Sequence, residues 1–375
     1  MAFYIVAIII SLLGLYDVFG KNSQIKNKLL KVVVFFLIVF LGTRGFLGWD
    51  WYFYYPSFLN GTYVYEKGYM FFTIFISRIW KNYIFYQFIT GSIDLLVFYF
   101  VFKRYCKYPI LTFAIFFSIQ GLQMEVELLR NMKAIVLFLL SLKYIEERKI
   151  LPFLLLNVLG ATFHLSALIY LPMYYILNIN YNKKIILSIF ILGSFYYIFD
   201  LKIFIILLEN LGNVSNGAFR DRVLNYKSVL PIETFRGLNM FYLERLILFA
   251  VAYFNEKNII LKNSAYIWIF IFLFTSELSI ISVRIGILFI YSIWIVLSRA
   301  VEIQDIRTKY LVLATIFLLC GFRLHNNLSF IGNADNYRYE NIIFGGLDYE
   351  RREKELKESK KFLKDSHGKE LLIQY

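Results

Sequence analysis

Long apolar stretches recur along almost the whole of this 375-residue chain, and they limit its fold more than any other feature. A helix that crosses a bilayer needs about 20 mostly apolar residues. Eleven stretches approach this length and composition, namely 3–19, 29–42, 83–102, 109–122, 129–145, 151–177, 185–208, 240–254, 264–281, 283–298 and 309–322. We therefore predict an all-α, polytopic integral membrane protein with about 10–12 transmembrane helices.

The composition supports this fold class and excludes several kinds of soluble enzyme. Hydrophobic residues make up 59% of the chain and aromatic residues 20%, more apolar surface than a soluble domain could bury. No Gly/Ser-rich linker divides the chain, so we expect one integral-membrane domain over residues 1–345, with a long loop at 210–238, and a charged tail at 346–375. The sequence contains no phosphate-binding loop and no zinc-protease or α/β-hydrolase motif.

The distribution of lysine and arginine predicts how the spans are oriented. Four lysines between residues 21 and 31 assign the first loop to the cytoplasm. The other basic loops agree with this only if residues 66–80 do not fully cross and residues 151–177 dip into the membrane and return. The loop 210–238 then lies on the outer side. The net charge of +14 exceeds what this bias explains, and it indicates a partner that bears phosphate or diphosphate.

Ionisable residues at membrane depth are costly, so each is a candidate for function. Arg44 and Asp50 lie in a stretch rich in tryptophan and tyrosine, which suits either an interfacial aromatic belt or the stacking of sugars. Glu66 follows, and it either favours a helix N-terminus or acts in chemistry. His164 lies within an apolar run, where it is either a hydrogen-bonded core residue or a base.

Three further candidates lie near apolar segments. Arg130 either forms an intrahelical ion pair with Glu127 or marks a helix end that, with Lys133, presents two cations to an anionic ligand. Arg220 and Tyr226 belong to the long loop 210–238, and Glu277 and Arg284 flank the turn of a predicted hairpin.

The order of these residues resembles bacterial O-antigen and exopolysaccharide polymerases of the Wzy and EpsG type. The resemblance spans about residues 40–345. Its motifs are Arg-x5-Asp (Arg44, Asp50), Glu-x-Gly-Tyr (Glu66, Gly68, Tyr69), Leu-Arg-x-x-x-Ala (Arg130, Ala134), Phe-His-x-Ser-Ala (Phe163, His164, Ser166, Ala167), Arg-x5-Tyr (Arg220, Tyr226) and a late helical arginine (Arg284). Lys133 departs from the small or polar residue common at its position.

The resemblance implies an enzyme similar to the C-type glycosyltransferases. Such enzymes join glycan repeat units that are linked to undecaprenyl diphosphate, and they need no metal, cofactor or nucleotide sugar. The expected partners are this lipid-linked oligosaccharide as donor and acceptor, the bilayer and a chain-length regulator protein, with no nucleic acid. The expected location is the bacterial cytoplasmic (inner) membrane, with the active site facing outward.

The same resemblance suggests residue roles. Arg130, Arg220 and Arg284 are expected to bind diphosphate, whereas Arg44, Tyr69, Tyr226 and Glu277 would position substrate. A base must take the proton of the acceptor hydroxyl, and the catalytic candidates are His164, Glu66 and Asp50. An O-antigen ligase, a flippase for lipid-linked sugars and a membrane O-acyltransferase remain alternatives.

Overall fold

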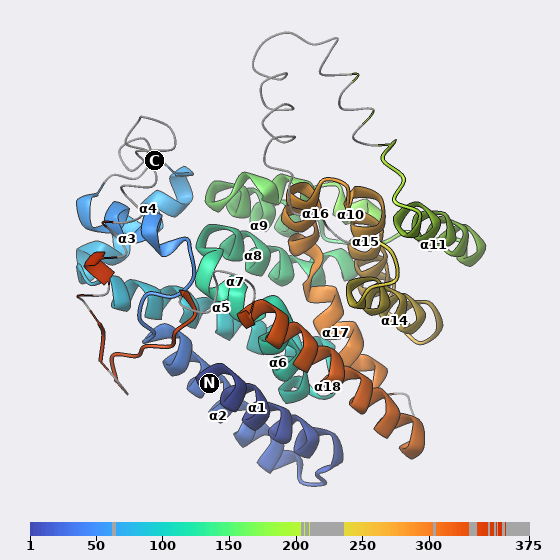
Figure 1. Ribbon diagram of the computed structural model, residues 1–375, viewed down its shortest axis with the longest axis horizontal. Coiled ribbons are helices and arrows are strands. Elements are labelled where there is room, and N and C mark those ends of the chain that lie inside the picture. The colour runs from blue at the N-terminus through green and yellow to red at the C-terminus, as the bar shows by residue number, and fades with distance from the viewer. Residues whose placement is uncertain are drawn as a thin grey trace. The chain divides into compact units, whose positions relative to one another are not determined.

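The computed structural model describes residues 1–61, 65–203, 206, 210, 236–302, 305–329, 336–343, 346–348, 350, 352–354 and 357. Regular structure in these residues is helical, and the β pairing found among them is confined to isolated bridges from Asn341 to Arg44 and to Gly346. The chain divides into two compact units, one formed by Met1–Tyr174 with Gln304–Tyr375 and the other by Tyr175–Ile303. Figure 1 shows the helices of both. The all-α prediction is confirmed.

Several helices are long and apolar enough to cross a membrane, which confirms a polytopic membrane protein. Among the described residues there are four such spans, at Ala2–Phe19 (α1), Tyr83–Tyr105 (α5), Pro109–Glu127 and Ile306–Ser329 (α18). A fifth arises if Ser282–Phe289 and Tyr291–Ala300, bent by 48°, count together. This is fewer than the eleven predicted stretches, because several of them form shorter helices, such as Ile150–Phe163 and Ile259–Thr275.

The span Pro109–Glu127 is interrupted in its middle. It consists of α6 (Pro109–Phe116), the short η1 (Phe117–Gly121) and α7 (Leu122–Glu127). Ile119 and Gln120 leave helical geometry, and Gln120 has a left-handed φ of 63°. Broken backbone at membrane depth is tolerated where protein covers it, and most residues of this span are buried.

The first unit also contains α2 (Ser23–Gly42), α3 (Trp51–Asn60), α4 (Lys67–Ile79), α8 (Leu129–Glu146) and α9 (Ile150–Phe163). Helix α2 packs against α5, α1 packs against α6, and α8 lies beside α9 (Figure 1). Asparagine side chains begin two of these helices, since Asn22 accepts from the amides of residues 24 and 25, and Asn82 accepts from Phe85 N.

Residues 150–176 form a hairpin that turns at His164. Helix α9 ends at Phe163, and after the extended residue His164 the chain continues as η2 (Leu165–Tyr170) and α10 (Met173–Ile176). It returns along α9, because a Cβ placed on Gly160 would lie 3.4 Å from Ala167 Cβ, and the rings of Phe153 and Tyr174 lie 5.3 Å apart. This hairpin has the shape expected of the dip at 151–177, and its depth in the bilayer stays a prediction.

The second unit is organised around α15 (Ile259–Thr275). This helix packs against α11 (Lys183–Ile198), α14 (Met240–Phe254), α16 (Ser279–Gly286) and α17 (Tyr291–Ala300), with η3 (Ile287–Phe289) between the last two. The buried Arg245 pairs with Glu244, and its guanidinium lies 4.1 Å from the ring centre of Trp268 and 4.0 Å from that of Phe272. These contacts stabilise a cation in the interior of the unit.

Candidate functional site

An ion pair between Glu66 and Arg130 forms the centre of a polar site in the first unit. Arg130 Nη1 donates to Glu66 Oε2 at 2.7 Å, and Arg130 Nε donates to the hydroxyl oxygen of Tyr54 at 3.1 Å. The ring centre of Tyr65 lies 4.6 Å from the guanidinium carbon. The side chain of Arg130 remains 27% exposed and that of Glu66 17% exposed. The guanidinium is therefore held in one orientation while part of the side chain stays accessible.

The positions of both residues follow from where their helices begin. Glu66 immediately precedes α4, and Arg130 lies in the first turn of α8. A cation at a helix N-terminus is opposed by the helix dipole, so Arg130 needs a nearby carboxylate. Burial alone would raise the pKa of Glu66, but a hydrogen bond from its own amide and the contacts with Arg130 outweigh this effect and hold the pKa below its usual value.

His164 adjoins the same carboxylate. Leu165 N donates to Glu66 Oε1 at 3.4 Å, which brings the residue next to His164 against this carboxylate. His164 Nδ1 accepts from Ser166 N at 3.2 Å and lies 2.7 Å from Ser166 Oγ, which in turn lies 2.7 Å from Asn131 Oδ1. We call Glu66, Arg130, Asn131, His164 and Ser166, with Tyr54 and Tyr65, the Arg130 site. Three predicted functional residues thus meet in one place.

A glycine brings the two sides of the Arg130 site together. A Cβ placed on Gly68 would lie 2.1 Å from Thr162 Oγ1, far inside any real contact. The first turn of α4 can therefore approach the end of α9 only because residue 68 has no side chain. The next residue, Tyr69, is buried. Its hydroxyl oxygen accepts a hydrogen bond from the Tyr86 hydroxyl at 2.8 Å. It packs against Tyr54, with ring centres 5.8 Å apart.

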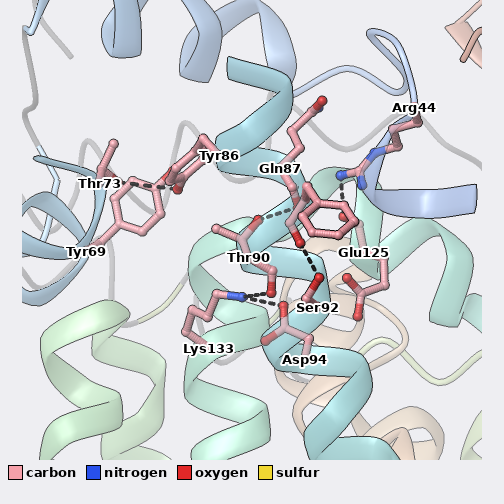
Figure 2. Close-up of polar contacts among 11 residues, drawn as sticks. Arg44, Tyr69, Thr73, Tyr86, Gln87, Thr90, Ser92, Asp94, Glu125 and Lys133 are labelled. Atoms are coloured by element: carbon pink, nitrogen blue, oxygen red, sulfur yellow. Dashed lines mark hydrogen bonds and ion pairs between the residues drawn. The ribbon is translucent and has the colours of Figure 1, made fainter. Parts of the chain in front are cut away.

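Arg44 lies in a second group of charges, which is buried (Figure 2). Its side chain donates to the carbonyl oxygens of Leu41 at 2.5 Å and Glu125 at 2.8 Å, and only 1% of Arg44 is exposed. Lys133 Nζ donates to Asp94 Oδ2 at 2.5 Å and to Thr90 O at 2.7 Å. We call Arg44, Asp94, Glu125 and Lys133 the buried charge group. Three of its members lie on α5, α7 and α8, and all four are buried, so the group does not line an exposed surface.

The aromatic stretch around Asp50 contributes mostly to the core. Asp50 precedes α3 and is partly buried, and the following Trp51, Tyr54 and Phe58 are buried in an aromatic cluster with Tyr69, Tyr83 and Tyr86. Trp49, in contrast, is 48% exposed. The two expectations for this stretch, an interfacial belt and a sugar platform, stay predictions for the exposed Trp49 and the partly buried Tyr52 and Tyr55.

The remaining predicted residues belong to the second unit or lie outside the described residues. Glu277 is buried in the turn between α15 and α16, and Arg284 is exposed on α16, both in the second unit. Arg220 and Tyr226 lie outside the described residues. Glu127 accepts from Tyr337 at 2.6 Å and from Gln123 at 3.3 Å, while Arg130 pairs with Glu66. Arg130 therefore pairs with Glu66 and not with Glu127. Lys133 does not join Arg130 at the helix end, because its side chain is buried and pairs with Asp94.

Sequence reasoning missed several contributors to these two groups of residues, among them Asn131, Tyr65, Asp94 and Glu125. Asn131 and Tyr65 complete the Arg130 site, and each is next in sequence to a predicted residue. Asp94 carries a charge inside the apolar run 83–102, which is the signal that should have identified it. No three His, Cys, Asp or Glu side chains of the described residues lie grouped as metal ligands. That the reaction needs no metal stays a prediction.

Fold and site together define a polytopic, all-α membrane protein with an arginine-centred polar site at the ends of its helices. The model of the EpsG family matches residues 27–341, so the chain belongs to the EpsG family. The matched range contains the whole Arg130 site and the buried charge group. No curated protein and no solved structure matches the chain. Membership of this family supports a polysaccharide polymerase-type role.

Proposed function

We propose that this protein is a membrane glycosyltransferase that polymerises O-antigen or an exopolysaccharide or capsule. It joins repeat units carried on undecaprenyl diphosphate at the outer face of the cytoplasmic membrane. The observation that carries this proposal is the meeting of Glu66, Arg130 and His164, from three separate segments, in one polar site. The family match supports the general role, and the reaction itself is our proposal.

The chemistry of the Arg130 site suits such a transfer. The hydroxyl oxygen of the acceptor attacks the anomeric carbon of the donor sugar, the bond from that carbon to the diphosphate breaks, and the hydroxyl proton passes to a base. Arg130 would bind the departing diphosphate, since its planar fork forms strong charge-assisted bonds with phosphate oxygens. Arg220 and Arg284 remain proposed contributors to diphosphate binding, and Glu66, His164 and Asp50 are the candidates for the base.

The surroundings of the site suit a substrate with a lipid tail. On α4, which begins beside Glu66, Phe71 and Phe75 are largely exposed, and Leu165 beside His164 is exposed as well. Apolar side chains exposed next to charged ones would place the lipid chain in the bilayer while the diphosphate reaches Arg130. A water-soluble nucleotide sugar has no lipid chain that could contact these exposed apolar side chains.

Glycan electrophoresis of a deletion strain tests the proposal. Loss of a polymerase leaves surface glycan with single repeat units, and the wild-type gene restores the ladder. A normal ladder in the deletion strain rejects the proposal. Complete absence of surface glycan indicates a flippase instead, polymer left on the lipid carrier indicates a ligase, and unchanged chain length without acetyl groups indicates an O-acyltransferase.

A further inference from the structure

The hydrogen bonds around His164 restrict what its imidazole can do. Ser166 N is a backbone amide, which can only donate, and it points at His164 Nδ1 at 3.2 Å. His164 is thereby the N-cap of η2, because its side chain accepts a hydrogen bond from an amide in the first turn of that helix. A nitrogen that accepts this bond carries no proton of its own. The proton of a neutral imidazole then lies on Nε2.

The nearby hydroxyl admits one other arrangement, which the amide disfavours. If Nδ1 carried the proton, it would donate to Ser166 Oγ at 2.7 Å and Ser166 Oγ would donate to Asn131 Oδ1. The hydrogen of Ser166 N would then face the hydrogen on Nδ1, and a partly buried amide would lose its acceptor. Leaving such a donor unsatisfied costs about 1–3 kcal/mol.

The arrangement with unprotonated Nδ1 keeps an acceptor for the amide, because Ser166 N and Ser166 Oγ share the lone pair of Nδ1. Ser166 Oγ donates to Nδ1, and the amide of Asn131 turns so that its nitrogen donates to Ser166 Oγ. Among the contacts of the described residues, the Asn131 side chain has no other hydrogen bond that this turn would break. Turning an amide exchanges its oxygen and nitrogen and leaves its shape unchanged.

We infer that His164 serves the proposed reaction as a hydrogen-bond donor through Nε2, directed at an oxygen of the lipid diphosphate, and is not the base. This inference rests on the proposed function. As the bond from sugar to diphosphate breaks, negative charge grows on the phosphate oxygens, and Nε2–H stabilises it beside Arg130 without giving up its proton. The proton of the acceptor hydroxyl passes to a carboxylate, Glu66 or Asp50.

Two substitutions separate the two nitrogens of the imidazole. In His164→Asn, the amide oxygen takes the place of Nδ1 and can still accept from Ser166 N, but the Nε2 donor is lost. In His164→Gln, the amide nitrogen reaches the place of Nε2 and can still donate, but the cap is lost. We expect purified His164→Asn in nanodiscs to keep the wild-type unfolding temperature and to polymerise a lipid-diphosphate repeat unit about 100-fold more slowly. His164→Gln should unfold at a lower temperature and stay within about ten-fold of the wild-type rate.

The opposite ranking overturns the inference, as does equal loss of activity in two folded variants, because a base needs the titrating ring itself. Nitrogen-15 NMR of histidine-labelled protein gives a readout that is independent of activity. The chain has only three histidines, and replacing the other two, His325 and His367, leaves the signal of residue 164 alone. We expect an unprotonated Nδ1 and a protonated Nε2, and a protonated Nδ1 would refute the inference even if neither variant folds. Wild-type protein that fails to polymerise the substrate counts against the proposed function alone, since the spectrum still decides the tautomer.

Discussion

Gly68 lies against Thr162 so closely that a Cβ on Gly68 would come within 2.1 Å of Thr162 Oγ1. This contact sets the separation of α4 and α9, and so the position of Glu66 relative to His164. Replacing Gly68 by alanine must push the two helices apart. Overpacking of this kind costs about 1–3 kcal/mol, and we expect Gly68→Ala to unfold at a lower temperature and to produce shorter glycan.

Gly321 supplies the matched control for this substitution. It lies in α18, and a Cβ placed on it meets nothing within 4 Å. Alanine there removes a flexible residue from a helix, so Gly321→Ala should leave the glycan unchanged and slightly raise stability. Equal behaviour of the two variants, measured by thermal unfolding and by glycan electrophoresis, would show that the Gly68 contact does not position the Arg130 site.

Arg130→Lys is expected to lose most of the polymerase activity although it keeps the charge. One guanidinium contacts both Glu66 and Tyr54, at 2.7 and 3.1 Å, and an ammonium cannot reproduce this planar geometry. We expect the polymerisation rate to fall by about 10- to 100-fold. Arg104→Lys is the control, because Arg104 pairs with Glu146 at an exposed position. If Arg130→Lys polymerises at the wild-type rate, the fork of Arg130 has no role in binding diphosphate.

The ion pair between Lys133 and Asp94 should matter mainly for stability. Both side chains are at least nine-tenths buried, so removing one partner leaves the other charge uncompensated. Asp94→Asn is expected to cost about 3–5 kcal/mol, and adding Lys133→Met should restore part of the loss. Chemical unfolding in detergent measures both effects. The exposed pair of Arg104 and Glu146 should contribute only about 0–1 kcal/mol, and a similar value for the buried pair would contradict its proposed role.

Glu66 should give the protein a distinctive sensitivity to acid. Its pKa in the folded protein lies below the ordinary value of 4.5, so the unfolded chain binds this proton more readily. The stabilisation from the Glu66 carboxylate is therefore complete above 4.5 and is lost as the pH falls through the lower folded value. We expect the unfolding temperatures of wild type and Glu66→Gln to differ most at neutral pH and to converge in acid. If the difference in unfolding temperature instead grew in acid, folding would raise the pKa of Glu66 and not lower it.

The sequence predicts the Arg130 site better than the buried charge group. Glu66, Arg130 and His164 stand out as polar residues near helix ends in apolar surroundings, and their meeting agrees with that signal. Lys133 and Asp94 are 39 positions apart in neighbouring helices, and no local pattern connects them. The sequence does not predict the direction of the Arg44 side chain either, because an arginine in a glycine-rich loop can point outward or inward. The structure turns Arg44 inward, toward the carbonyl oxygens of Leu41 and Glu125.

The sequence predicts one break within the apolar runs and misses another. The turn at His164 was expected, because the basic loops agree only if residues 151–177 return to the side they start from. The interruption at Ile119 and Gln120 has no proline to mark it, and it depends on surrounding helices that cover the freed backbone. The apolar stretches outnumber the spans of the described residues for another reason, because several of them, such as Ile150–Phe163 and Ile259–Thr275, form shorter helices.

The most direct test of the Arg130 site is polymerisation by purified protein in nanodiscs, with a lipid-diphosphate repeat unit as the sole substrate and glycan length read by electrophoresis. We compare the wild type with Arg130→Ala and Arg104→Ala, each checked for wild-type folding. The Arg130 site predicts a ladder for wild type and Arg104→Ala and only the starting single repeat for Arg130→Ala. A normal ladder from folded Arg130→Ala would contradict a catalytic role for this site.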